Sequence, residues 1–325
     1  MLVYAGIDEA GYGPMLGPLC VACSVLVIDD HDPETGPCDL WKRLAKAVCR
    51  KRTDSRHRIA IDDSKKLKGA RDGLVHPLRF LERGVIAFAQ ASNPNHRFCE
   101  CDHDLLEQFG VQECGRPWYG SRTDLPVGQT ADELRIAAGR LRTVMTQQGV
   151  RCESLRCEAI DAGEFNQQVD RMGTKSSVNF CAVLRHIDAI WRRWPSEHPR
   201  VMVDRQGGRT HYLNDLLLAW PEAEVQVLCE TDTLSRYRLR RRDSWLTVSF
   251  QVEAEQSHLP VALASMTAKY TRELLMIRLN RFFRGLVPEL KPTAGYVEDG
   301  RRYLADIEPT ISRLGLARNE LVRTV

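Results

Sequence analysis

The sequence has few aromatic residues, almost no net charge and no long uninterrupted apolar run. Phe, Trp and Tyr make up 7% of its 325 residues, and 46 Lys and Arg against 43 Asp and Glu leave a formal charge of +3. That balance allows a nucleic-acid partner without demanding one, so any basic surface must be local. With 43% hydrophobic and 27% charged residues, the composition excludes a disordered or collagen-like chain and is typical of a globular protein.

The sequence also lacks the pattern of a membrane helix or a secretory leader. Residues 10–28 are uncharged, but Pro14, Pro18 and several glycines interrupt them, which argues against a spanning helix. Asp8 and Glu9 stand where a signal peptide would need its apolar region. The eleven cysteines are odd in number and scattered, so we expect free thiols, and a cytoplasmic protein with no membrane contact.

Periodicity predicts an α/β chain. Strands are expected at 2–8, 19–28, 84–91, 200–204, 224–229, 235–242 and 244–253, and helices at 41–50, 131–148, 176–193, 210–220, 257–283 and from 300 to the end. No helical segment separates the first two strands, so we expect them to pair antiparallel. Three early strands followed by alternating helices and strands predict a mixed sheet flanked by helices. Ser257 is the expected N-cap of the long helix.

Residues 94–130 differ from the rest of the chain. They contain three cysteines and several Gly, Pro and aromatic residues, with little periodicity. A structureless stretch of this length is unusual inside a compact core. We therefore interpret the region as an inserted loop or subdomain.

Acidic residues stand at the ends of three predicted strands. Asp8 and Glu9 end the first, Asp204 ends the strand at 200–204, and Glu255 follows the strand before the long helix, with Glu253 as its nearby rival. Hydrolysis of a phosphodiester by two metal ions needs a cluster of carboxylates, because Mg²⁺ prefers oxygen ligands. Neighbouring strand residues face opposite ways, so Asp8 and Glu9 share a site only where the strand ends or bulges. Any one of these acids alone is more often an ordinary surface group.

Glycines come directly after the first acids. Gly11 and Gly13 make a strand break plausible and let backbone N–H groups approach a phosphate. They belong to the motif Gly-Ile-Asp-Glu-Ala-Gly-Tyr-Gly-Pro-Met-Leu-Gly-Pro-Leu at 6–19. Four further motifs follow in order. They are Asp-Ser-Lys-Lys-Leu at 63–67, Val-Asp at 203–204, the acid Glu255 with the helix after it up to residue 272, and Gly-Tyr at 295–296. Together these motifs resemble the type 2 ribonuclease H (ribonuclease HII) family, over roughly residues 1–92 and 155–305.

The resemblance implies a ribonuclease H-like fold and a metal-dependent endoribonuclease with two Mg²⁺ or Mn²⁺ ions. Its substrate would be the RNA strand of RNA–DNA hybrids or ribonucleotides embedded in duplex DNA, and its products would carry 5′-phosphate and 3′-hydroxyl ends. The implied division is a catalytic domain at 1–92 and 151–285, an insertion at 93–150 and a C-terminal helical extension at 286–325.

The resemblance also assigns roles by position. The catalytic and metal-binding acids would be Asp8, Glu9, Asp204 and Glu255, and the substrate-binding residues Gly11, Tyr12, Gly13, Ser64, Lys65 and Tyr296. Ser64 and Lys65 would contact phosphates. Tyr296 would stack on a sugar at the RNA–DNA junction, where the 2′-hydroxyl distinguishes the two nucleic acids.

This chain departs from the family pattern in three places. Tyr12 replaces an arginine between two glycines, Glu255 replaces an aspartate, and Arg205-Gln206 replaces a Gly-Asn pair. We therefore expect the cleavage chemistry to be retained more strictly than substrate choice. The alternatives are a nucleic-acid-binding protein on a degenerate ribonuclease H scaffold and a metal-dependent DNA nuclease that uses the same acids.

An arginine-rich strand has two interpretations. Arg236, Arg238 and Arg240 share one face of residues 235–242, with Tyr237 nearby. They form either a ribbon that follows a phosphate backbone or a charged edge strand that resists aggregation.

Several isolated residues also leave alternatives open. Cys99, Cys101, His103 and Cys114 lack the usual zinc spacing, so we favour free thiols over a zinc site. His258 either assists proton transfer beside Glu255 or faces solvent, which we favour. Lys269 either orders the acids from behind, which we favour, or pairs with a surface acid.

Overall fold

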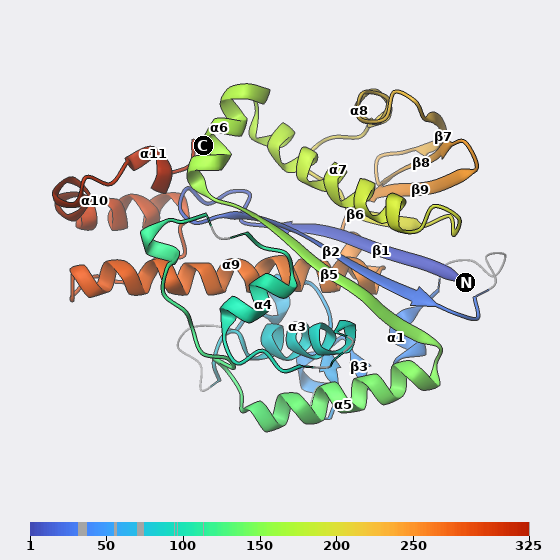
Figure 1. The fold of residues 1–325 in the computed structure, drawn as a ribbon, viewed down its shortest axis with the longest axis horizontal. Helices are drawn as coiled ribbons and strands as arrows, with labels where there is room; N and C mark the ends of the chain where they lie inside the picture. Colours follow the sequence, from blue (N-terminus) through green and yellow to red (C-terminus); the bar gives the residue numbers. More distant parts are fainter. Residues whose placement is uncertain are drawn as a thin grey trace.

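The computed structural model of the chain describes residues 1–31, 38–54, 57–69, 75–93, 95, 97–112 and 114–324. Its central feature is a seven-stranded sheet in the order β5-β2-β1-β6-β9-β8-β7 (Figure 1). β1 (Leu2–Ala10) pairs antiparallel with β2 (Leu19–Ile28) and parallel with β6 (Arg200–Asp204). The other strands are β5 (Val150–Ile160), β7 (Glu224–Glu230), β8 (Leu234–Arg241) and β9 (Ser244–Gln251), and β3 (Val48–Cys49) and β4 (Ile59–Ala60) form a separate pair. The predicted antiparallel pair and mixed sheet are confirmed.

Helices cover both faces of the sheet, as Figure 1 shows. One face packs against α3 (Arg79–Ser92), α5 (Ala131–Gln147) and α9 (Leu259–Leu286), and the other packs against α6 (Ala162–Met172), α7 (Lys175–Arg193) and α8 (Leu213–Ala219). Strand alternation makes these two faces. In β1, Val3, Ala5 and Ile7 belong to the core beside α7, whereas Tyr4 belongs to the core beside α9.

The start of α9 lies directly against β1. A side chain at Gly6 would overlap the backbone of Pro260 and Val261, so only glycine permits this approach. Ser24 on β2 donates a hydrogen bond to the Pro260 carbonyl at 2.6 Å. These contacts fix the preceding turn, η4 (Ala254–Gln256), next to the sheet.

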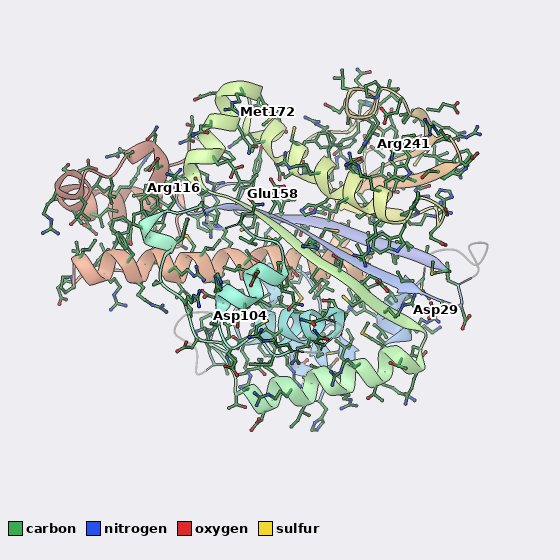
Figure 2. All side chains as sticks on the ribbon, viewed as in Figure 1. Asp29, Asp104, Arg116, Glu158, Met172 and Arg241 are labelled. Carbon is green, nitrogen blue, oxygen red and sulfur yellow. The ribbon has the colours of Figure 1, made fainter. Side chains whose placement is uncertain are left out.

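The C-terminal helices extend the core beyond the sheet. α10 (Val297–Leu314) and α11 (Arg318–Leu321) pack with the second half of α9 and with η3 (Pro117–Tyr119). Arg116, labelled in Figure 2, pairs with Asp161 at 3.4 Å and with Glu320 at 2.6 Å. The region after residue 93 therefore contacts both the sheet and the C-terminal helices. Within the described ranges, no helix combines the length and apolarity that crossing a membrane requires.

Two predicted elements are wrong. Residues 84–91 are not a strand but lie in α3, where every residue from Gly84 to Gln90 is buried. A helix enclosed on several sides shows a continuous apolar run, which periodicity cannot distinguish from a strand. The expected helix at 41–50 is only α1 (Leu40–Arg43), after which the chain enters β3.

Other departures concern segments with weak signals. β5 was not predicted, because charged residues interrupt the apolar alternation of this edge strand. Residues 94–130 contain α4 (Asp102–Gln108) as well as η3. The N-cap of α9 is His258 rather than Ser257, and it caps without a side-chain hydrogen bond. Two short elements complete the description, η2 (Arg52–Asp54) and α2 (Ser64–Leu67).

Candidate active site

Sheet register brings acids from three segments to one edge. β1 and β6 run parallel and their last paired residues are Ile7 and Val203, so Asp8 and Asp204 follow at the same carboxyl end. β9 pairs parallel with β6 and ends where η4 begins. The backbone N–H of Ala254 donates to Asp204 Oδ1 at 3.0 Å, and this bond holds η4, which contains Glu255, beside Asp204.

The expected strand end or bulge at Asp8 and Glu9 is wrong, because β1 stays in unbroken register with β2 through Ala10, and the two side chains leave opposite faces of the strand. The charges of the four acids nevertheless act on one another. Burial, with the charges of Glu9 and Asp204, raises the pKa of Asp8 well above its usual range. Burial and the Asp204 charge raise the pKa of both Glu9 and Glu255 to about 7. Burial also raises the pKa of Asp204. The four carboxylates therefore repel one another with too little positive charge nearby to compensate.

α2 places its first residues at the same site. Its N-cap, Asp63, accepts from the Lys65 backbone N–H at 2.9 Å, and the Lys65 charge lowers the pKa of both Glu9 and Asp204. The buried Ser64 hydroxyl accepts a hydrogen bond from Ser265 on α9 at 3.0 Å. The structure thus places Ser64 and Lys65 beside the acids.

Asp63 and Ser265 were not identified from the sequence as members of this site. The charge of Asp63 raises the pKa of Glu255, and a hydrogen bond with Ser265 lowers that of Asp8. Asp63 had a signal, because it opens the motif at 63–67. Ser265 belongs to the site only because α9 crosses the sheet at that point.

The glycine loop after β1 borders the acids. Gly11 has φ +86°, and a Cβ there would lie 2.5 Å from Arg272 Nε, so the position requires glycine. Around Gly13 the space is open. Tyr12 lies beside Lys175, whose Nζ is 5.2 Å from the Tyr12 ring centroid. Burial, and to a smaller extent the Glu9 charge, raise the pKa of Tyr12, whereas a hydrogen bond with Ser176 lowers it.

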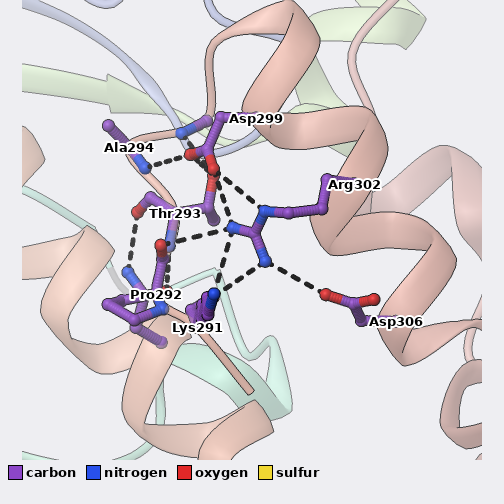
Figure 3. A network of polar contacts seen from close by, with 9 residues as sticks. Lys291, Pro292, Thr293, Ala294, Asp299, Arg302 and Asp306 are labelled. Carbon is purple, nitrogen blue, oxygen red and sulfur yellow. Dashed lines mark hydrogen bonds and ion pairs between the residues drawn. The ribbon is translucent and has the colours of Figure 1, made fainter.

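A polar network stabilises the segment at 291–294 just before Tyr296 (Figure 3), and backbone hydrogen bonds join Gly295 to the loop after β1. The backbone N–H groups of Met15 and Leu16 both donate to the Gly295 carbonyl, at 2.9 and 3.1 Å. Asp299 Oδ2 accepts from Thr293 Oγ1 at 2.5 Å and from the Ala294 N–H at 3.1 Å, while Arg302 donates to Asp299 Oδ1 at 2.7 Å. The Tyr296 side chain is 54% exposed, so the network presents an aromatic ring to solvent at a fixed place.

Two buried amides adjoin the acids and were also missed. Asn179 on α7 and Gln206 after β6 both lower the pKa of Glu9. Nevertheless, among the described residues, Asn179 Nδ2 and Oδ1 and Gln206 Nε2 have no hydrogen-bond partner of normal geometry. Buried polar atoms rarely stay unpaired, so these groups point to a polar ligand at the site. The only sequence signal for Asn179 is a polar residue among apolar neighbours on a predicted helix.

The donor set fits a hard divalent cation in type and charge, since it consists of crowded carboxylates with unpaired amides beside them. Across the described ranges, however, no three His, Cys, Asp or Glu side chains gather closely enough to hold an ion. This also applies to the alternative zinc set, in which Cys99 faces Gln108 at 3.6 Å whereas Cys114 lies beside Arg116 and Asp161.

Two favoured interpretations of single residues are wrong. His258 is not solvent-facing, because its ring lies between the Tyr4 hydroxyl at 2.5 Å and the Gln251 amide at 3.0 Å. Lys269 pairs with Glu273 at 3.1 Å, one helical turn away, rather than with the acidic site. A lysine and a glutamate spaced i,i+4 on one helix are natural partners, and this local pairing accounts for Lys269.

Comparison with known proteins gives matches among solved structures only. No protein-family model matches the chain, and no curated protein does. The chain is similar to ribonuclease HII of Archaeoglobus fulgidus in its complex with PCNA, at 16% identity and a TM-score of 0.42, covering 99% of this chain and 94% of that one. It is similar to ribonuclease H2 of Pyrococcus horikoshii OT3 at 14% identity and a TM-score of 0.43, covering 98% and 92%. It is similar to Bst ribonuclease HIII in complex with Mn²⁺ at 16% identity and a TM-score of 0.41, covering 99% of this chain and 66% of that one.

These structures bear the family name that the motifs predicted. The fold itself is a mixed seven-stranded sheet with helices on both faces. All three TM-scores lie below 0.5, so function is inferred below from the chain's own residues.

Proposed function

We propose that this chain is a metal-dependent endoribonuclease. It cleaves the RNA strand of RNA–DNA hybrids, or ribonucleotides embedded in duplex DNA, and leaves 5′-phosphate and 3′-hydroxyl ends. The observation that carries the proposal is the shared electrostatic site of Asp8, Glu9, Asp204 and Glu255, whose pKa values are all raised. Clustered carboxylates with raised pKa values are typical of functional sites rather than of structural ion pairs.

In this proposal the four acids hold two Mg²⁺ or Mn²⁺ ions. When bound, the ions supply Lewis-acid activation of a water nucleophile and stabilisation of the leaving 3′-oxygen. Lys65, exposed beside Glu9 and Asp204, attracts the phosphate next to the cleaved bond. The open space at Gly13 lets backbone N–H groups approach another phosphate.

Tyr12 and Tyr296 are the proposed groups for substrate choice. Both belong to segments that share hydrogen bonds at Gly295, so they act as one surface beside the acids. The exposed Tyr296 ring provides a stacking face for a sugar or base. Tyr12 stands where a guanidinium would have donated hydrogen bonds, and we infer that this chain tolerates longer ribonucleotide stretches.

The test uses three labelled duplexes, namely an RNA–DNA hybrid, a DNA duplex with one ribonucleotide and an all-DNA duplex. Each is incubated with the protein and Mg²⁺ or Mn²⁺ between about pH 7 and 9. We expect cleavage of the first two, and its loss in Asp8→Asn without loss of folding, because that change removes a buried repelling charge. Cleavage by Asp8→Asn would refute the site assignment.

The same assay separates the alternatives. Hybrid binding that survives EDTA, with no product under either ion, would establish a binding protein on a ribonuclease H scaffold. Cleavage confined to the all-DNA duplex would establish a DNA nuclease that uses the same acids.

A further inference from the structure

A cavity lies on the face of the sheet where β1, β6, β9 and β8 are adjacent. Its volume is about 340 Å³. Its apolar lining includes Leu2, Tyr4 and Met202, and its polar lining includes three arginines from β6 and β8, Arg200, Arg236 and Arg238. The arginine-rich strand singled out in the sequence thus contributes two of its three arginines to a concave site.

Register explains why the guanidinium groups converge. Thr247 on β9 is paired with Arg200 on one side and Arg238 on the other. Arg236 is two residues along β8 from Arg238 and therefore faces the same side. Since β8 lies between β9 and β7, the alternative of a charged edge strand is wrong. Three cations face one cavity from within the sheet.

The hydrogen bonds of these arginines leave donors unused. Arg200 Nη1 donates to Thr247 Oγ1 at 2.9 Å, and Arg236 Nε donates to Ser249 Oγ at 3.0 Å. Arg238 Nε is buried and has no hydrogen-bond partner among the described residues. In the described part of the chain, neither the ion pairs nor the hydrogen bonds join these three guanidinium groups to a carboxylate.

The groups around the cavity respond to this positive charge. The pKa of Arg200 is lowered by its burial and by the charges of Arg238 and Arg236. The pKa of His198 is lowered to about 4 by its burial and by the charges of Arg200 and Arg238. The charge of Asp39 raises the pKa of Tyr4. Asp39 itself caps the N-terminus of α1, where its side chain accepts a hydrogen bond from the Lys42 N–H at 3.1 Å. Partly buried cations without a counter-charge are costly, and a bound anion would compensate them.

We propose that this cavity binds the phosphate group of a mononucleotide-sized ligand. Guanidinium groups match phosphate oxygens in a bidentate manner, and Arg238 Nε supplies a donor that no group among the described residues accepts. The apolar floor formed by Leu2, Tyr4 and Met202 accommodates the rest of the ligand. A cavity of this volume lies at the small end of the range for small-molecule sites, which favours a free nucleotide over a duplex. None of the four acids lines this cavity, and the proposal does not depend on the nuclease proposal.

The test is isothermal titration calorimetry on the full chain with three probes, namely inorganic phosphate, AMP and a 5′-phosphorylated single-stranded oligonucleotide, at constant ionic strength. We expect saturable binding of AMP, and weaker binding of phosphate. Arg238→Gln and Arg200→Gln should each reduce AMP affinity at least about tenfold, because each loses a charge-assisted contact. Thermal unfolding identifies which of the two variants remains folded.

Arg240→Gln is the matched control. Arg240 lies on the same strand and face, but it is exposed and packs on Trp245, with its guanidinium carbon 5.1 Å from the ring centroid, outside the cavity. Its AMP affinity should equal that of the unchanged protein. The proposal is overturned if AMP does not bind saturably at millimolar concentration. It is also overturned if Arg240→Gln loses as much AMP affinity as Arg238→Gln and Arg200→Gln. Binding of the oligonucleotide without binding of AMP would equally overturn it, since the anion would then be a nucleic-acid backbone.

Discussion

Glu9→Gln tests the crowding of the acids directly, through stability rather than activity. Burial and Asp204 raise the pKa of Glu9 from its ordinary 4.5 to about 7. A carboxyl whose pKa is higher in the folded than in the unfolded state destabilises the fold once it ionises. The penalty is therefore absent below about pH 4.5, grows as pH rises and is complete above about pH 7. At about 1.4 kcal/mol per pKa unit, the difference of roughly 2.5 units amounts to about 3 kcal/mol.

Glutamine keeps the shape of the side chain but has no proton to lose. We expect Glu9→Gln and the unchanged protein to unfold with similar free energies at pH 4.5, and the variant to be more stable by about 3 kcal/mol at pH 8. The measurement is urea unfolding in EDTA at several pH values. Glu197→Gln, a change of the same kind at an exposed glutamate outside the site, provides the control and should show no such divergence.

Two results would contradict this reasoning. Parallel stability profiles of Glu9→Gln and the unchanged protein would mean that Glu9 does not share its site with Asp204. A divergence of opposite sign, with the variant losing stability as pH rises, would mean that a cation compensates Glu9. Adding millimolar Mg²⁺ at pH 8 extends the test, since ions bound by these acids should stabilise the unchanged protein more than the variant.

Three further predictions concern the support of the site. Asp102→Ala should destabilise the fold by about 3–5 kcal/mol in urea unfolding, because the buried Arg278 would lose its carboxylate partner. Arg278 donates to Asp102 at 2.6 and 2.7 Å. A loss of stability below about 1 kcal/mol would contradict a buried ion pair. Asp299→Ala should raise KM for the hybrid with little change in kcat, because Thr293 and Ala294 lose the acceptor that positions the segment before Tyr296. Asp299→Asn should restore part of the lost substrate affinity. Equal falls in kcat for both variants would argue against a positioning role. Gly11→Ala should cost more than about 1 kcal/mol at its positive φ, whereas Gly13→Ala, in open space, should stay within about 0.5 kcal/mol in the same unfolding assay.

The parts of the fold that the sequence predicted are those with simple environments. β1 and β6 are largely apolar runs with acids at or near their ends, and α7 has one apolar face, so their patterns follow from two-sided or one-sided burial. α3 and β5 failed for opposite reasons. α3 is apolar on nearly every side, whereas β5 lies at an edge and mixes buried and charged positions. Pattern reasoning fails where burial does not alternate with the period of the element.

The site divides in the same way. Asp8, Asp204 and Glu255 could be predicted as neighbours because the carboxyl ends of parallel strands meet at one edge of a sheet. Asn179 and Ser265 could not, because each sits mid-helix and reaches the acids only through the approach of α7 or α9 to the sheet. Tertiary packing, rather than local sequence, selects such groups.

The near-zero net charge conceals a strong separation of charge along one strand. β6 begins with Arg200, which faces the arginine cavity, and ends with Asp204 in the acidic site. Four residues of extended chain separate them by about 13 Å, beyond the Debye length of about 8–10 Å at moderate salt, so neither group neutralises the other through solvent. In the part of the chain that the structure describes, each end keeps partly buried charge of one sign, which at the acidic end Lys65 offsets only in part. Such charge costs stability unless something binds. The composition could predict only that a basic surface must be local, and the strand order explains why that surface and the acidic site occupy opposite ends of the same strand.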